Sequence, residues 1–422
     1  MSQRTASWTG IGLVAALWLL FSLLGLGLSL VLSLAAPLAS VRNGAPVTLG
    51  GMSLLSLLLA GGLLYMAWGA LHDRPSSAWF PAKTWLWLAG LALLTLVLGF
   101  LTPARWQTTW LFVPIHAGQI VFTALALMAV AATAAGPASP TRRQWSLTLS
   151  WGTLSTLPAI FLELFAGMTT LILLATFMAL LPDGRATLEA WAKQMEALQA
   201  TGTIDPAVIQ EWLRSPYILG TLAFMLGLVT PVLEELIKAL PVALLTRQER
   251  GASLTHAYLW GLACGAGFAM LEGIGNGGSS LGTASGGWLT GVLSRVPASA
   301  MHMLTSGLIG LGWAYAWRRK YGRLALAYLL AMGFHGLWNL MAVMLMGGTA
   351  FIGTSVTPGL PEGVSLFALL VLGSQALSAL LLVPLLPLAL RRLDPLSQPS
   401  AAELPDERLA DEPGESAGAM AL

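Results

Sequence analysis

Long runs of apolar residues, each about 20 residues in length, recur along the whole chain between short polar segments. A run of this length suits a helix that crosses about 30 Å of hydrocarbon and satisfies its own backbone hydrogen bonds there. The pattern therefore predicts an all-α protein, a polytopic transmembrane helical bundle of about ten spans. The expected spans are residues 8–36, 50–71, 83–101, 108–133, 147–181, 217–246, 254–275, 288–317, 323–348 and 364–390.

The spans and loops divide the chain into five parts. These are an N-terminal five-span membrane region (1–181), an extracytoplasmic loop (182–216), a group of four spans (217–348), a final span (349–392) and a cytoplasmic tail (393–422). Within the loop, residues 185–200 predict a short amphipathic helix that lies at the membrane interface. The tail is rich in Pro, Ser and acidic residues, which predicts disorder.

The placement of basic residues in several of the short loops predicts the orientation in the membrane. Basic residues follow spans four, six, eight and ten, whereas loops 276–287 and 349–363 carry no Lys or Arg. Because loops rich in Lys and Arg stay on the cytoplasmic side, we expect both termini to be cytoplasmic. The first span lacks a convincing cleavage site, so we expect it to be retained as a helix.

Composition excludes several classes of protein. Only 9% of the residues are charged and the net charge is +2, which argues against a nucleic-acid partner and leaves the lipid bilayer as the expected one. The single cysteine, Cys264, excludes an intramolecular disulfide and a multi-cysteine metal site.

Two adjacent acidic residues, Glu234 and Glu235, lie inside the apolar run 217–246. A charged side chain near the middle of a bilayer costs about 2.5 kcal/mol or more, so such residues usually serve a function. Lys238 follows at helical spacings of four and three residues, and can pair with either carboxylate.

The next three spans add further ionisable or polar residues at helical spacing. His335 and Asn339 are four residues apart, and Arg295 and His302 are seven apart, so each pair shares one helix face. Counted from the basic loops, His302 and His335 lie at a depth similar to that of the glutamate pair. By the same count, Glu272 lies nearer the outer surface. We expect it either to pair there with Arg295, or to reach the glutamates and histidines because its helix is distorted.

Small residues and prolines in the same region predict close helix packing and kinks. Span 254–275 carries a stripe of small residues at four-residue intervals, which allows another helix to approach closely. Pro231 and Pro241 flank the glutamates and are expected to kink their helix. The stripe consists of Ala257, Gly261, Gly265 and Ala269.

The order of these motifs resembles that of the PrsW family, bacterial glutamic intramembrane proteases related to the CPBP group, which includes CAAX-prenyl endopeptidases. The resemblance covers roughly residues 217–345. In one departure, Gly273 follows the glutamate of the glycine-rich motif, where the family usually has Asn. The motifs are Glu-Glu-x-x-Lys (Glu234, Glu235, Lys238), GAGFAMLEG (Gly265–Gly273, with Glu272), an Arg–His helix (Arg295, His302) and His-x-x-x-Asn (His335, Asn339).

The resemblance implies a peptidase of the bacterial cytoplasmic (inner) membrane that cuts a membrane-protein or peptide substrate in or beside a membrane segment, an anti-sigma factor being one candidate. It assigns Glu234 as the base that activates water, His302 as its partner, and His335 with Asn339 as the oxyanion side. Glu235 would orient these groups and Lys238 would balance charge. The family's chemistry implies no metal and no cofactor.

Other interpretations of the same residues stay open. Glu234, His302 and His335 form a plausible ligand set for zinc in a metal-dependent protease, although the sequence has no His-Glu-x-x-His motif. The buried charges could equally serve a proton-coupled transporter. A catalytically silent membrane scaffold is the third alternative. In the protease interpretation, Lys238, Glu272 and Arg295 are expected to be supporting residues.

Overall fold

In the computed structural model, the described residues are 3–35, 44–77, 81, 83–201, 208, 212, 215–248, 253–281, 287–352 and 362–394. Their regular structure is helical throughout, as predicted, with no β-strand among them. The helices are α1 (Gln3–Ala35), α2 (Ala45–Leu71), α3 (Thr84–Leu101), α4 (Ala104–Gln107), η1 (Trp110–Phe112), α5 (Val113–Ala135), η2 (Gly136–Ala138), α6 (Arg142–Ala179), α7 (Pro182–Thr201), α9 (Pro216–Phe224), η3 (Met225–Val229), α10 (Thr230–Lys238), α11 (Leu240–Gln248), α12 (Leu254–Gly278), α13 (Gly287–Trp317), α14 (Tyr321–Ile352) and α15 (Glu362–Leu393).

Nine helical stretches of the described chain are long and apolar enough to cross a membrane. They coincide with nine of the ten predicted spans; the remaining one corresponds to α13, which has 31 residues but includes Arg295 and His302. Much of α13 is covered by neighbouring helices, so protein rather than lipid surrounds its polar residues. A helix in this position needs less apolar surface than one that faces lipid.

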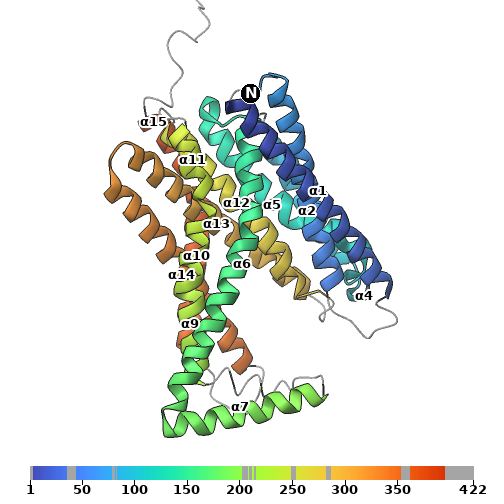
Figure 1. The fold of residues 1–422 in the computed structure, drawn as a ribbon, viewed down its shortest axis with the longest axis vertical. Helices are drawn as coiled ribbons and strands as arrows, with labels where there is room; N and C mark the ends of the chain where they lie inside the picture. Colours follow the sequence, from blue (N-terminus) through green and yellow to red (C-terminus); the bar gives the residue numbers. More distant parts are fainter. Residues whose placement is uncertain are drawn as a thin grey trace, which may run out of the picture.

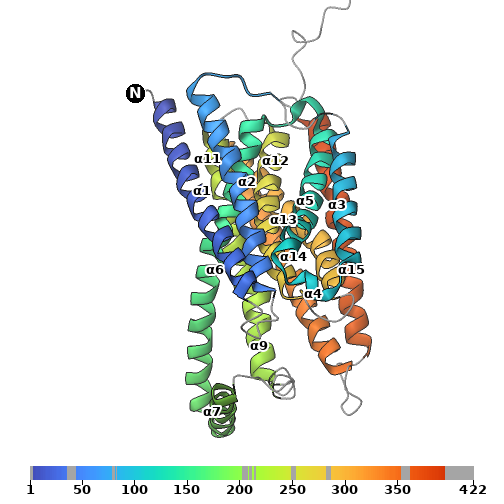
Figure 2. The ribbon, with the colours of Figure 1, turned by 90° about the vertical axis from the view of Figure 1, so that its right-hand side faces the viewer.

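α12 is the central helix of the bundle (Figures 1 and 2). In its apolar window 94% of the residues are buried inside the protein, against 11% for the peripheral α3. α12 packs against α13 on one side and α6 on another, while α1 and α2 pair at the edge of the bundle.

α6 crosses the bundle and continues to α7, which lies crosswise at the far end (Figure 1). α6 begins at a capping box, in which the side chains of Thr141 and Gln144 bond each other's backbone N–H groups. α7 covers the predicted amphipathic stretch 185–200, while its place at the membrane interface stays a prediction. The predicted tail, from the residue after Asp394 onward, lies outside the described residues.

The stripe of small residues on α12 receives α13, as predicted. A Cβ atom on Gly265 would collide with the carbonyl oxygen of His302, and one on Gly261 would collide with that of Ser306. On another side of α12, a Cβ on Gly267 would collide with the carbonyl oxygen of Leu149 in α6. Glycine therefore allows both neighbouring backbones to approach α12 and fixes the position of His302 relative to it.

The span with the glutamates departs from a regular α-helix beside both prolines, with a π-helical turn before Pro231 and the end of α10 before Pro241, while the kink itself stays a prediction. The helix adopts a π-helical turn, η3, before α10, and the N–H of Thr230 bonds the carbonyl of Met225. Pro231 has no N–H to offer, so the carbonyl of Leu226 is left without its usual backbone donor. The Nδ2 of Asn339 donates to this carbonyl at 3.0 Å. This bond links α14 to the π-helical turn.

Candidate active site

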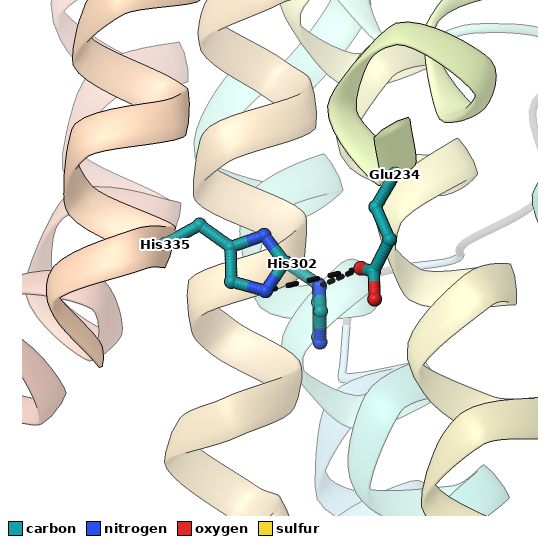
Figure 3. A group of neighbouring side chains, drawn as sticks. All are labelled: Glu234, His302 and His335. Carbon is teal, nitrogen blue, oxygen red and sulfur yellow. Dashed lines mark ion pairs between the residues drawn. The ribbon is translucent and has the colours of Figure 1, made fainter. Parts of the chain in front are cut away.

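Five ionisable side chains from three helices meet in the interior of the bundle. α10 supplies Glu234, Glu235 and Lys238, α13 supplies His302 and α14 supplies His335. All are buried, and Glu234 is the most accessible of them at 6% exposure. Figure 3 shows Glu234 and both histidines pointing toward one another. The structure thus brings together the predicted base and both predicted histidines.

Lys238 lies at the centre of the cluster. Its Nζ is 3.0 Å from Glu234 Oε2, 2.8 Å from Glu235 Oε1 and 2.9 Å from His302 Nδ1. The ammonium group also stands 4.3 Å from the centre of the Phe268 ring, a cation–π contact. Because an ammonium has three N–H donors, these three partners use all of them. The lysine pairs with both glutamates at once.

Glu235 is fully buried, and one of its oxygens holds several groups in place. Oε1 accepts hydrogen bonds from Lys238 and, at 3.0 Å, from the hydroxyl of Thr305. The Nδ1 of His335 lies 2.9 Å from the same oxygen. Glu235 therefore anchors three elements of the cluster, in keeping with its predicted orienting role.

The two imidazoles differ in what remains available on each ring. The Nδ1 of His335 donates to Glu235, which assigns a lone pair to its Nε2, and this atom faces Glu234 Oε2 at 3.8 Å. His302 has both nitrogens engaged: Nδ1 meets Lys238 and Nε2 lies 2.7 Å from Glu272 Oε2. The ring with an available nitrogen beside Glu234 is therefore that of His335.

Glu272 lies in the cluster although its depth along the sequence suggested a more outward place. Besides contacting His302, it pairs with Arg295, whose Nη2 lies 2.9 Å from Glu272 Oε1. Both side chains are partly exposed, Glu272 at 22% and Arg295 at 15%. The pairing with Arg295 confirms one of the two expected arrangements, and these two residues form the more accessible side of the site.

Two other predicted features have structural explanations. The Nδ2 of Asn339 donates a hydrogen bond to the carbonyl of Leu226, and the oxyanion role of this residue remains a prediction. At Gly273 a Cβ would lie 3.0 Å from Ile120 Cγ2, in α5. Ile120 therefore occupies the room that an asparagine side chain would need there.

Sequence reasoning missed three residues of the cluster. Thr305 lies one helical turn after His302 and bonds Glu235, and Phe268 packs on His302 with ring centres 5.4 Å apart. The third, Glu163 in α6, has a buried Oε1, and α6 packs against α10, which carries Glu234. The spacing of Thr305 from His302 is a usable signal in the sequence, whereas no helical spacing connects Glu163 with the motifs of the later spans.

Comparison with known families agrees with this arrangement. A family model described as PrsW family intramembrane metalloprotease matches residues 140–373, more than half of the chain. The chain belongs to the PrsW family. The match begins before α6, so this helix belongs to the PrsW region together with the four helical spans that carry the motifs. No match was found among the curated proteins or among the solved structures.

The description of the PrsW family includes a metal ion, and three side chains have suitable donor atoms. One ligand atom each of Glu234, His302 and His335 lies within 4.8 Å of the others. Each histidine also contacts a second carboxylate through its other nitrogen, an arrangement common around metal ions. By donor type alone, the set suits zinc.

The position of Lys238 decides against a metal ion in this arrangement. Glu234 Oε2 and His302 Nδ1 are 3.9 Å apart, so an ion bonded to both at about 2.0 Å would lie near their midpoint. Lys238 Nζ lies 3.0 and 2.9 Å from the same atoms, which places it about 2 Å from that point by simple triangulation. A protonated amine has no lone pair to offer a metal, and both cations cannot occupy this space.

Proposed function

We propose that this chain is an intramembrane peptidase in which Glu234 activates a water molecule to hydrolyse a peptide bond. The observation that carries the proposal is the pairing of two acceptor atoms, Glu234 Oε2 and His335 Nε2, at 3.8 Å. Two acceptors at this separation can each receive one hydrogen of the same water, at ordinary hydrogen-bond lengths of about 2.8 Å. The water oxygen then directs a lone pair away from both.

In the proposed reaction, the water oxygen bonds to the carbonyl carbon of the peptide as Glu234 takes one proton. The carbonyl oxygen becomes an oxyanion, and the C–N bond then breaks as the proton passes from Glu234 to the leaving amine. His335 holds the water in place. This assignment gives His335 the role that the resemblance assigned to His302, because His302 has no available nitrogen.

Lys238 and Glu235 keep the reacting groups in position. The ammonium of Lys238 offsets the charge of Glu234 and Glu235, and supplies a fixed positive charge beside the atoms where negative charge develops. Glu235 sets the tautomer of His335 through the bond to Nδ1. A charged pair that is already in place needs no reorganisation during the reaction.

A second candidate is a metal-dependent peptidase, favoured by the donor set of Glu234, His302 and His335 and by the two histidine–carboxylate contacts. It requires Lys238 to leave its three partners. Removal of metal ions by a chelator distinguishes the two: a glutamate-activated water keeps its activity, and a metal-dependent enzyme loses it.

We propose as substrate a membrane protein cut in or beside its membrane segment, because the site is buried in a bundle of membrane-crossing helices. The bacterial cytoplasmic membrane is the proposed location, and regulated cutting of a protein such as an anti-sigma factor is a candidate role. The proposed location and the candidate role are both inferred from membership of the PrsW family.

The proposal is tested with purified protein in liposomes that contain a library of single-pass transmembrane peptides. Mass spectrometry of the products identifies new peptide ends. We expect new ends with the wild type and none with Glu234→Gln, while Glu189→Gln, which changes an exposed acid in α7, should cleave normally. Solute flux without cleavage would instead support a transporter. The absence of both cleavage and flux would support a scaffold.

A further inference from the structure

An open groove of about 440 Å³ lies between α6 and α9, two helices that run toward α7 at the far end of the bundle (Figure 1). Its volume is within the range of about 300–1,000 Å³ that ligand sites span. Both helices belong to stretches that are long and apolar enough to cross a membrane, so the groove opens toward lipid. The residues of its two walls are Thr170, Leu173 and Phe177 in α6, and Tyr217, Gly220 and Phe224 in α9.

The seam between the two walls leads from the groove to the candidate active site. α9 continues through η3 into α10, which carries Glu234, and α6 packs against all three of these elements. Glu234 follows Phe224 by ten residues, which is about 15 Å along a helix. About five residues of extended polypeptide cover the same distance.

Met225 lies at the end of the groove that is nearer to Glu234. Its side chain is buried, and its Sδ accepts a hydrogen bond from the hydroxyl of Thr170 at 3.2 Å. A Cβ at Gly167 would lie 3.8 Å from the Cε of Met225, an ordinary contact distance. Because methionine is unbranched and has three rotatable side-chain bonds, this side chain can move aside without a shift of the backbone.

Two features of the walls favour a polypeptide over a lipid acyl chain as the occupant. Thr170, Tyr217 and Thr221 line the groove and carry hydroxyl groups, which can bond polar groups of a polypeptide, whereas an acyl chain offers none. Gly220 has no side chain, and nothing lies within 4 Å of a Cβ placed there. The backbone of α9 is therefore open to the close approach of another helix.

We propose that this groove is the docking site of the substrate. An apolar transmembrane segment lies between α6 and α9, and the residues that adjoin this segment extend along α10, past Met225, to Glu234. The inference rests on the proposed function, because it takes Glu234 as the base that acts on this substrate. It also gives α6 and α9 a role that the motifs of the later spans do not include.

Cross-linking tests the docking site without requiring cleavage. Gly220→Cys is combined with Glu234→Gln and placed in liposomes with the transmembrane peptide library, each peptide carrying one cysteine in the middle of its apolar segment. Gly333→Cys is the matched control, since this glycine is also open to a depth of 4 Å but lies on α14. The native Cys264 is buried. After mild oxidation, we expect peptides joined to position 220 in severalfold higher yield than to position 333, and equal yields would overturn the proposal.

A second measurement fills the groove in the cleaving protein. Gly220→Phe should raise KM for the library peptides by at least about tenfold with kcat nearly unchanged, because it removes binding without touching the reacting groups. Gly333→Phe should leave both constants as in the wild type. An unchanged KM in Gly220→Phe would overturn the proposal and leave the groove to lipid. If the wild type cleaves nothing, the proposed function fails, and the cross-linking yields still decide whether the groove binds a transmembrane segment.

Discussion

The Nζ of Lys238 lies 2.9 Å from the Nδ1 of His302, the nitrogen that would face a metal ion shared with Glu234. A lysine thus occupies the place of a cation in a site whose other groups resemble metal ligands. The arrangement has a consequence that can be measured directly. Removing the ammonium group of Lys238 should leave Glu234, His302 and His335 in place and free to bind a metal ion.

We therefore predict that Lys238→Ala gains a zinc site that the wild type lacks. The variant should bind about one zinc ion per chain through Glu234, His302 and His335, since three donors of this kind suit zinc. Metal content measured by mass spectrometry after dialysis against zinc checks this. Lys193→Ala, at an exposed position of α7, is the matched control and should bind none. Stoichiometric zinc in the wild type would contradict the prediction.

The second prediction concerns Glu235 and stability. Glu235→Gln removes the charge that pairs with Lys238 in a fully buried setting, and breaking such a pair costs about 3–5 kcal/mol. We expect the free energy of unfolding to fall by about this amount, measured by denaturant or thermal unfolding in detergent micelles. Glu189→Gln should not change it. An unfolding curve of Glu235→Gln identical to that of the wild type would show that the pair contributes nothing.

A third prediction follows from the π-helical turn before α10. Asn339→Ala leaves the partly buried carbonyl of Leu226 without its donor, which costs up to about 1–3 kcal/mol. Adding Pro231→Ala restores a backbone N–H near this carbonyl, so the double variant should regain part of the lost stability. Unfolding of the two single variants and the double variant measures the coupling. Strict additivity of the two changes would contradict the role assigned to Asn339.

The fourth prediction concerns the contact of α12 with α13. A leucine at Gly265 would collide with the backbone at His302 and push α13 away. Because a displacement of about 1 Å costs about 100-fold in rate, we expect Gly265→Leu to lose at least that much activity. Gly333→Leu is the matched control, since nothing lies within 4 Å of a Cβ at this position in α14. Cleavage rates of both variants in liposomes check the prediction, and comparable rates would contradict it.

The sequence predicted the membrane fold well, because a long apolar run has few alternatives in lipid. The small-residue stripe and the glutamate–lysine spacing likewise correspond to direct contacts in the structure, such as those between Gly265 and His302 and between Lys238 and both glutamates. These features depend on helical geometry alone, which a sequence expresses directly.

Other parts of the site depend on contacts that spacing cannot express. Counting residues from a loop placed Glu272 too far outward, since the count ignores how neighbouring helices are tilted and offset. The hydrogen bond from Asn339 to the carbonyl of Leu226 depends on the π-helical turn, which the sequence does not reveal. A loop and an amphipathic helix separate α6, which carries Glu163, from α10 in the sequence, and only helix packing brings α6 and α10 together.

The central claim, hydrolysis by a water that Glu234 activates without a metal ion, is tested most directly by counting new peptide ends from the transmembrane library after chelator treatment. We predict that the treated wild type produces the same ends as the untreated protein, and that Glu234→Gln lowers their yield by at least about 100-fold, within the range for loss of a general base. Undiminished cleavage by Glu234→Gln, or loss of cleavage by the treated wild type with recovery on adding zinc, would contradict the claim.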